Sequence, residues 1–364
     1  MNTNTNKDFG KDKNIELLPP GQLQPNTSNL KASLFNLVIF THEPRRTAYF
    51  QDIAQMIAKQ FPCRIIFIQA DNSVKEPYLR VKLQNNKDKF GMNCDFISIE
   101  VGGSYLDRVR FLILPYFITD LPIYLLWGQD PTIETAILPY LQNDSTRLVF
   151  DPECSENLQK FSQRLLKQHE TSPVEITDMD WARLRGWREV LNKVFDCQER
   201  IDQLNSSKII KIIYNNRPSD PFFHPQTQAF YFQAWLAAQL KWEFVEMKKE
   251  NDNTTLYYTL GKHQIKIILQ GESRQHLPTE EILEFEASNQ SNFLYCLTHK
   301  GENQVLVHCN TIDRCELPFT LFLPNISSGR TFMQEIFYKK TSEQYFHMLK
   351  MISTIHGNSQ NGKI

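Results

Sequence analysis

Hydrophobic and polar positions form blocks along the chain, and the spacing within each block predicts its secondary structure. Residues Phe35–Thr41 are a nearly continuous apolar run, which is typical of a strand covered on both faces. Residues Thr47–Gln60 carry apolar side chains at helical spacing, and Arg64–Ala70 is a second apolar run. A strand, a helix and a strand in this order predict a right-handed crossover and a parallel pair.

The same alternation of strands and helices continues to about residue 150. The pattern predicts strands and helices, in chain order, at Cys94–Val101 (strand), Tyr105–Leu114 (helix), Leu121–Trp127 (strand), Ile133–Leu141 (helix) and Arg147–Phe150 (strand). The polar segment from Asp71 to Asn93 is predicted as a long loop. We therefore expect an α/β N-terminal domain with a mainly parallel sheet.

The second half of the chain has a different pattern. It begins with an apolar strand at Lys208–Tyr214 and a helix at Gln226–Leu240. Strands separated by turn residues follow, at Glu243–Met247, Thr254–Leu260, Gln264–Leu269, Ile282–Ala287, Asn292–Thr298 and Gln304–Cys309. Helices near Phe332–Tyr338 and Ser342–Ile355 close the chain. This order predicts an α+β C-terminal domain with a mainly antiparallel sheet.

The segments between these blocks set the expected domain boundaries. An amphipathic helix at Asn157–His169 and a hinge at Thr171–Asp178 lie between the two halves. The chain is thus expected to comprise a disordered tail (1–30), an N-terminal domain (31–153), a helical connector (154–205), a C-terminal domain (206–356) and a second disordered tail (357–364).

Composition limits the classes of partner. The 364 residues carry a formal net charge of −1, with 40 basic and 41 acidic side chains, which argues against nucleic acid or an anionic membrane as the main partner. No apolar run approaches the roughly 20 residues of a membrane span. The first residues lack the apolar core of a secretory signal, and the 7 cysteines are scattered without a CxxC pair. These features favour a reducing, cytoplasmic location.

The densest group of tryptophan and arginine residues lies in the segment Thr177–Asp196, here called the Trp–Arg segment. We expect one helix, capped by Thr177 or Asp178 and with the charge of Asp180 in its first turn. Helical spacing places a set of apolar side chains on one face, namely Trp181, Leu184, Trp187, Leu191, Val194 and Phe195.

The arginines of this segment leave two interpretations open. Arg188 points into the apolar face, where its guanidinium needs a carboxylate or carbonyl partner. Arg185 and Arg183 lie within stacking reach of Trp181 and Trp187, respectively. The segment is either a buried core helix or a docking element, because tryptophan and arginine are the residues most enriched at binding hot spots.

The residues at the end of the first strand show whether the chain has the sequence features of a dinucleotide site. A nicotinamide dehydrogenase has a glycine fingerprint there, because glycine permits the tight turn and the close approach of pyrophosphate. This chain has Glu43 and Pro44 instead, so we expect no such cofactor. Arg45 and Arg46 precede the following helix and could form either an anion site or an ion-paired edge.

Two other groups of residues could carry chemistry. Arg217, Asp220 and His224 follow a strand, so they could form a ligand or acid–base site, or only satisfy a proline-rich turn. Cys309 and Cys315 could meet as a redox pair or remain separate thiols. No metal site with ligand spacing, and no GxSxG, HExxH or P-loop motif, occurs in the sequence.

Several blocks together resemble one known family. Residues 180–189 with Phe195 and Asp196 are similar to the DxxWTRLxPWRxLLAxxFD signature of the glucose-6-phosphate dehydrogenase assembly protein (OpcA) family. Segments 46–66, 120–131, 146–151 and 234–242 resemble further blocks of that family, in the same order. Ala182, Gly186 and Leu126 depart from the family pattern at single positions.

The resemblance implies a non-catalytic, cytoplasmic protein that binds glucose-6-phosphate dehydrogenase and promotes its active oligomer in the oxidative pentose phosphate pathway. On this basis we expect a set of residues to contact the partner or shape the contact surface, namely Trp181, Arg183, Arg185, Trp187, Arg188, Arg45 and Arg46. No catalytic residue, metal or cofactor is expected. The rival from another class is a sugar-phosphate-binding enzyme with its site near Arg217, Asp220 and His224.

Overall fold

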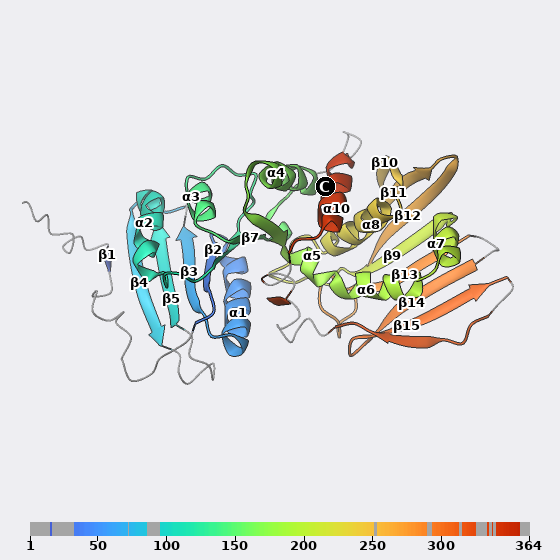
Figure 1. The fold of residues 1–364 in the computed structure, drawn as a ribbon, viewed down its shortest axis with the longest axis horizontal. Coiled ribbons are helices and arrows are strands. Elements are labelled where there is room, and N and C mark those ends of the chain that lie inside the picture. The colour runs from blue at the N-terminus through green and yellow to red at the C-terminus, as the bar shows by residue number, and fades with distance from the viewer. Residues whose placement is uncertain are drawn as a thin grey trace, which may run out of the picture. The chain divides into compact units, whose positions relative to one another are not determined.

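The computed structural model folds as two compact units (Figure 1). Unit 1 comprises residues up to Gln129 and Ile133–Val149, and unit 2 comprises Asp130–Thr132 and Phe150–Ile364. The structure describes residues 15–16, 33–71, 73–85, 95–250, 253–289, 293–312, 315–324, 333–334, 337 and 340–356. The expected tails, apart from 15–16, and most of the helix expected near 332–338 lie outside these residues. The expected connector, 154–205, falls within unit 2.

Unit 1 is built on a mainly parallel sheet, as the sequence predicts. Its strands lie in the order β1-β4-β5-β3-β2-β6-β7. Their bounds are β1 (Ile15–Glu16), β2 (Asn36–Thr41), β3 (Arg64–Asp71), β4 (Tyr78–Asn85), β5 (Asp95–Gly102), β6 (Ile123–Gly128) and β7 (Arg147–Phe150). β2 pairs in parallel with both β3 and β6, β3 pairs in parallel with β5, and β4 runs antiparallel to β5.

Helix α1 (Pro44–Gln60) forms the crossover between β2 and β3. Proline at its start is favourable because the first amide of a helix has no partner within the helix. Its buried face includes Phe50, Ile53 and Ile57, which match the predicted helical spacing. The remaining helices of unit 1 are η2 (Gly103–Arg108), α2 (Val109–Ile113), η3 (Leu114–Tyr116) and α3 (Ile137–Asn143).

One expectation for unit 1 is wrong. The segment 71–93, predicted as a loop, contains β4. Leu79 and Val81 are buried while Arg80 and Lys82 face solvent, which is the two-residue alternation of a strand with one wet face. The alternation of Leu79, Val81 and Leu83 spans only five residues, and the polar residues on either side hide it in the sequence.

Unit 2 contains a larger, mainly antiparallel sheet in the order β10-β11-β12-β9-β13-β14-β15-β16. The strands are β9 (Ile209–Asn215), β10 (Glu243–Glu250), β11 (Asn253–Leu260), β12 (His263–Glu272), β13 (Ile282–Ser288), β14 (Phe293–Gly301), β15 (Gln304–Thr311) and β16 (Phe319–Phe322). β9 is central and is parallel to β12 but antiparallel to β13. The predicted fold class, α/β followed by α+β, is confirmed.

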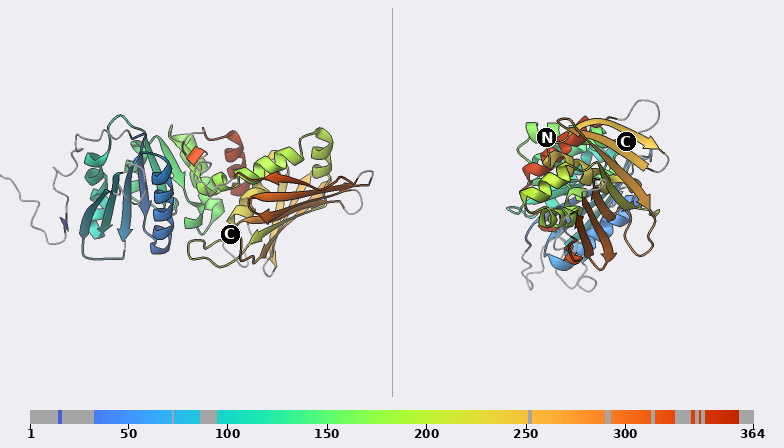
Figure 2. Two further views of the ribbon diagram at one scale, coloured as in Figure 1. Left: turned by 90° about the horizontal axis from the view of Figure 1, so that it is seen from below. Right: turned by 90° about the vertical axis from the view of Figure 1, so that its right-hand side faces the viewer.

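The helices of unit 2 bury their apolar faces against this sheet and against one another. They are η4 (Pro152–Cys154), α4 (Leu158–Thr171), α5 (Met179–Arg183), α6 (Arg185–Val194), α7 (Gln198–Asn205), α8 (Thr227–Gln239) and α10 (Glu343–Thr354), with the short strand β8 (Glu175–Asp178) before α5. Phe232 of α8 contacts Phe285 of β13 and Trp187 of α6. Figure 2 shows α6 and α8 along one face of the sheet.

None of the helices in the described part of the chain is long and apolar enough to cross a membrane.

Gly128, at the end of β6, allows a close approach of α1 to the sheet. A Cβ atom at this position would lie 2.8 Å from the carbonyl oxygen of Phe40 and would also overlap the ring of Phe50. We expect Gly128→Ala to lower the free energy of unfolding of unit 1 by about 1–3 kcal/mol, because the close-packed surroundings must shift. Faster hydrogen exchange in β2 and α1, measured by mass spectrometry, would report this loss.

Gly261→Ala is the control for that measurement. A Cβ atom at Gly261 has no neighbour within 4 Å, and the residue lies in a turn of unit 2 at a φ of 61°, so the strain of the substitution falls on that turn and not on unit 1. Its substitution is expected to leave exchange in β2 and α1 unchanged. Equal exchange in the wild type and Gly128→Ala would show that the packing at Gly128 is not tight.

Candidate functional site

The Trp–Arg segment forms two short helices, α5 and α6, rather than the single helix that its sequence predicts. The chain tightens at Leu184, whose ψ of −6° departs from the usual α-helical value of about −42°. The expected cap is present, because Asp178 Oδ1 accepts a 2.7 Å hydrogen bond from the amide of Trp181. Gly186 follows the break, and a Cβ atom there would lie only 3.0 Å from the side chain of Leu323.

Three of the expected partner-binding side chains lie inside unit 2. Trp181, Trp187 and Arg188 are 2%, 3% and 9% exposed. The guanidinium of Arg188 lies 3.3 Å from the centre of the Trp181 ring, and its Nη2 donates a 3.0 Å hydrogen bond to the Trp181 carbonyl. Arg188 therefore finds the carbonyl partner that its position requires. In this conformation these three residues can support the helices that carry a contact surface, but they are too buried to contact a partner themselves.

Arg183 and Arg185 reach closer to solvent. Arg183 forms ion pairs with Asp180 and, at 3.4 Å, with Glu280. Arg185 Nε donates a 2.8 Å hydrogen bond to Glu189 one turn further along α6. The side chain of Arg185 is 19% exposed, so it can meet a partner protein, whereas that of Arg183 is 10% exposed and is held by its two buried carboxylate partners.

The two arginines of unit 1 have opposite environments. Arg45 is exposed at the start of α1. Arg46 is buried, and its guanidinium lies 4.3 Å from the centre of the Tyr49 ring. Of this pair, Arg45 alone has a side chain at the surface.

Asp178 joins three helices of unit 2 through one buried carboxylate. Its Oδ2 accepts hydrogen bonds from the hydroxyl groups of Tyr231 in α8, at 3.0 Å, and Tyr345 in α10, at 2.7 Å. Burial raises the pKa of Asp178 to about 6, although its hydrogen bonds to Trp181 and to the two tyrosines oppose this shift. The carboxylate thus positions α5 against α8 and α10.

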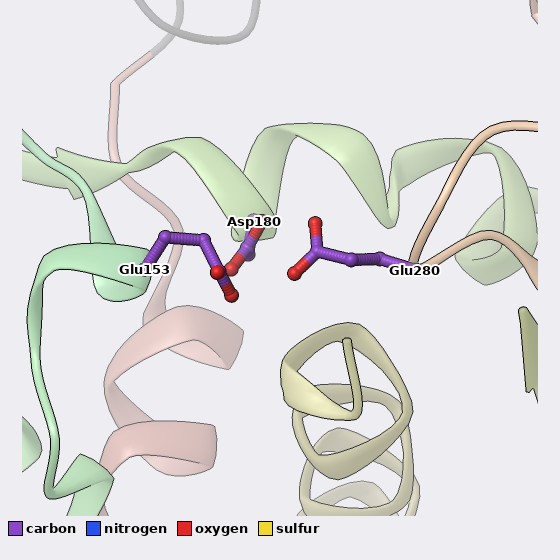
Figure 3. A group of neighbouring side chains, drawn as sticks. All are labelled: Glu153, Asp180 and Glu280. Atoms are coloured by element: carbon purple, nitrogen blue, oxygen red, sulfur yellow. The ribbon is translucent and has the colours of Figure 1, made fainter. Parts of the chain in front are cut away.

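A second group of buried carboxylates lies beside this helix junction. Glu153 from η4, Asp180 from α5 and Glu280 from the turn before β13 point toward one another (Figure 3). We call these three residues the acidic cluster. Each can offer one oxygen such that all three atoms lie within 4.8 Å of one another. The residues are 1%, 0% and 0% exposed, so the cluster is removed from bulk water.

One oxygen of each carboxylate has a protein partner. Glu153 Oε2 accepts hydrogen bonds from the amides of Phe223 and His224, at 2.9 and 3.1 Å. Arg183 binds Asp180 Oδ1 and Glu280 Oε2. The other oxygens, Glu153 Oε1, Asp180 Oδ2 and Glu280 Oε1, are buried and have no hydrogen-bond partner among the described residues.

The ionisation of the cluster is strongly perturbed. Burial raises the pKa of Asp180 to about 7, while Arg183 lowers it and Glu153 raises it further. Burial, followed by the charges of Glu153 and Asp180 and by a side-chain hydrogen bond with Glu153 once one of the two is protonated, raises the pKa of Glu280 well above its ordinary value. Glu280 and Glu153 can therefore share a proton when no cation is bound. Like charges held together out of water disfavour full ionisation. The cluster therefore needs protons or a compensating positive charge.

Sequence reasoning does not identify this cluster. Asp180 stands out in the sequence only for its charge in a helix first turn, and the sequence around Glu153 and Glu280 contains no ligand spacing. The three residues are far apart in the chain, so folding alone brings them together. The one sequence signal for the cluster is the i,i+3 spacing of Asp180 and Arg183, which pairs their side chains on a helix.

A pocket of about 380 Å³ adjoins the cluster through Arg183 and Gln228. Among its lining residues are Trp187, Glu281 and His299. His299 Nδ1 lies 3.5 Å from Glu281 Oε1. Burial raises the pKa of Glu281 to about 7, and burial with the nearby Arg274 and His276 lowers the pKa of His299.

The three side chains expected to bind a ligand do not line this pocket, although Phe222 of the same loop does. Arg217 Nη1 donates a 2.7 Å hydrogen bond to the carbonyl of Gln275, and Asp220 is exposed. Within this fully described loop, no hydrogen bond or ion pair joins the side chains of Asp220 and His224. The loop contributes to the acidic cluster through its backbone, because the amides of Phe223 and His224 donate hydrogen bonds to Glu153.

Cys309 and Cys315 lie at neighbouring positions of two paired chain segments. Asn310 forms an antiparallel bridge with Cys315, and the carbonyl of Cys309 accepts a 3.1 Å hydrogen bond from the amide of Glu316. Both thiols are free, with Cys309 buried and Cys315 exposed. Burial raises the pKa of Cys309 to about 11.

The fold is similar to that of a crystallised 3-ketoreductase from Actinomadura kijaniata in complex with TDP-benzene and NADP. The TM-score is 0.53 at 10% sequence identity, over 88% of this chain and 96% of the ketoreductase. At this identity the likeness concerns the fold alone.

Relatives at higher identity occur in cyanobacteria. A protein of Nostoc punctiforme is 26% identical over 230 residues, which cover 60% of this chain and 47% of the relative. A protein of Synechococcus elongatus is 23% identical over 268 residues, which cover 69% of this chain and 58% of the relative. Both are named OxPP cycle protein OpcA. The chain thus spans about half the length of the curated relatives that it matches.

Two family descriptions match consecutive parts of the chain. Residues 54–167 match the N-terminal domain, and residues 174–307 the C-terminal domain, of a family described as a glucose-6-phosphate dehydrogenase subunit. Together the matches include most of unit 1, the whole Trp–Arg segment and most of the large sheet. The chain therefore belongs to the OpcA family of glucose-6-phosphate dehydrogenase subunits.

Proposed function

We propose that this chain binds glucose-6-phosphate dehydrogenase and promotes its active oligomer, without catalysing a reaction itself. The observation that carries the proposal is the pair of family matches over residues 54–167 and 174–307, whose descriptions name a subunit of that dehydrogenase. The names of the cyanobacterial relatives support a place in the same pathway.

The turn after β2 supports a role other than hydride transfer. In a parallel sheet of this kind, a dinucleotide lies against a glycine-rich turn at the carboxyl end of the first strand. Here the turn contains His42, Glu43 and Pro44. A carboxylate and a proline ring remove the open amides and the space that a pyrophosphate needs. The turn after β2 therefore favours a role for unit 1 in protein binding over a role in binding a dinucleotide.

Binding energy can act on the dehydrogenase only through a preference for one of its states. A tenfold shift between an inactive and an active state needs about 1.4 kcal/mol of differential affinity. A few well-placed arginine contacts are sufficient for this. The partly exposed position of Arg185 and the exposed position of Arg45 support a role for both in such contacts, and the buried Trp181, Trp187 and Arg188 pack α5 and α6 beneath the surface of unit 2.

Mixing the purified chain with the dehydrogenase tests the proposal directly. Size-exclusion chromatography with light scattering, with activity measured across each peak, should show co-migration, a larger dehydrogenase oligomer and higher turnover. Separate migration with unchanged turnover would contradict it. Turnover of sugar phosphates by the chain alone would instead favour the enzyme alternative.

Redox control is a second candidate property of the same protein. Pairing of Asn310 with Cys315 places Cys315 one residue away from facing Cys309. Side chains alternate between faces along a strand, so Cys315 lies on the face opposite to that of Cys309, and a disulfide would require a change of register in this short pairing. Disulfide formation would need a small-molecule disulfide as oxidant. The exposed Cys315 thiolate would attack it and release one thiol, and the Cys309 thiolate would then displace the second thiol from Cys315. Cys315 would react first, because Cys309 is buried and its pKa is raised to about 11.

Arg185→Ala tests the docking surface. The Arg185–Glu189 pair is partly exposed, so its loss should change the free energy of unfolding by less than about 1 kcal/mol. If Arg185 is an anchor, the dissociation constant for the dehydrogenase should rise at least about fivefold, equivalent to about 1 kcal/mol. Titration of dehydrogenase activity would measure the change.

Lys193→Ala is the matched control, because Lys193 is an exposed basic residue of the same helix. It should bind the dehydrogenase as the wild type does. If both variants keep wild-type affinity and activation, α6 is not a docking element. If both weaken binding equally, general charge attraction is responsible.

Alkylation tests the two thiols of the redox candidate. In the reduced, folded protein, iodoacetamide at about pH 8 should label Cys315 and the exposed Cys197 well before Cys309. A thiol with a pKa of about 11 is ionised to roughly one part in a thousand at that pH. Peptide mass spectrometry would measure the rates, and labelling of Cys309 as fast as Cys197 would contradict its burial.

A further inference from the structure

We propose that Glu153, Asp180 and Glu280 form a binding site for a hard divalent cation of the Mg²⁺, Mn²⁺ and Ca²⁺ class. The proposal goes beyond the proposed function, since neither its argument nor its test involves the dehydrogenase. It is carried by the mutual geometry of the three carboxylates and by their unpartnered oxygens.

The unpartnered oxygens are the first argument. Glu153, Asp180 and Glu280 are all at least nine-tenths buried, and each keeps one oxygen without a hydrogen-bond partner among the described residues. A buried acceptor without a partner is costly, and buried polar groups in folded proteins almost always have one. Figure 3 shows the three carboxylates directed toward a common region. A bound cation there would satisfy all three residues together.

Distance and donor type are the second argument. The ligand oxygens of the cluster lie within 4.8 Å of one another. Calcium binds oxygen at about 2.3–2.6 Å, so two of its ligands can be separated by up to about twice that distance. Mn²⁺ and Mg²⁺ need only a small contraction of the same cluster. All three donors are carboxylates, which select hard cations over zinc or copper.

Charge balance is the third argument. Three ionised carboxylates with Arg183 leave a net charge of −2 in the buried cluster. One divalent cation brings that sum to zero. Arg183 itself binds Asp180 Oδ1 and Glu280 Oε2, so it neutralises part of the charge while leaving the other two oxygens available.

The pocket beside the cluster gives an ion a route to the carboxylates. Arg183 and Gln228 line the pocket, and both donate hydrogen bonds to Glu280. These two side chains therefore lie between the pocket and Glu280, and an ion that enters from the pocket would have to displace them. The site would link η4, α5 and the turn before β13, so an ion bound there should stabilise unit 2.

The test uses the full chain, stripped of metal with EDTA and dialysed. We expect it to bind one Mn²⁺ per chain, measured by electron paramagnetic resonance and by metal analysis after desalting. At a hundredfold excess over the dissociation constant, Mn²⁺ should raise the melting temperature by about 5–10 °C. Mg²⁺ and Ca²⁺ are then tested as competitors for Mn²⁺.

Glu280→Gln and Glu153→Gln are the diagnostic variants. An amide oxygen can still accept the hydrogen bonds from Arg183 or from the amides of Phe223 and His224, so both variants should fold. Each should weaken Mn²⁺ binding at least about tenfold and lose the thermal response. Glu199→Gln, at an exposed position of α7, should keep both properties.

Two results would overturn the proposal. One is a wild-type chain that binds none of Mn²⁺, Mg²⁺ and Ca²⁺, in which case the carboxyl groups share protons instead. The other is Mn²⁺ binding of equal strength in the wild type and in both glutamine variants, which would place the ion elsewhere.

Discussion

Carboxylates removed from water organise unit 2, and most of its helical packing follows from how each of them finds compensation. Asp178 accepts three hydrogen bonds, from the amide of Trp181 and from the hydroxyl groups of Tyr231 and Tyr345. The penalty for leaving such a group unpaired is larger than the gain from an ordinary hydrogen bond. The three donors therefore fix α5, α8 and α10 relative to one another more strictly than apolar contact could.

In the Trp–Arg segment, too, each buried charged group has a partner. Its tryptophans are buried, and Arg188 stacks on Trp181 while binding the carbonyl of that residue. Its other arginines lie at the border between this interior and solvent. A motif of this kind combines a rigid interior with a charged edge. The docking and core interpretations of the sequence are thus compatible for different residues of one segment.

The sequence predicts the elements of both sheets well where one physical signal dominates. The apolar run at 35–41 and the turn-separated strands after residue 243 become strands, because a continuous apolar run needs cover on both faces and alternation needs one buried face. Prediction fails for β4, where a short alternation of three apolar residues lies in a polar segment, and at Leu184, where a tight turn divides the expected helix. The acidic cluster is beyond prediction, because its members meet only in the folded chain.

The hydrogen bond between Tyr345 and Asp178 joins the last described helix to a residue near the middle of the chain. During synthesis the ribosome releases Asp178 long before Tyr345. Until α10 emerges, the carboxylate has one hydroxyl donor fewer, and the surfaces of α4 and α8 that α10 covers stay open to solvent. Unit 2 therefore completes its interior only after α10 has been synthesised, whereas the strands of unit 1, all N-terminal to residue 151, are free to assemble earlier.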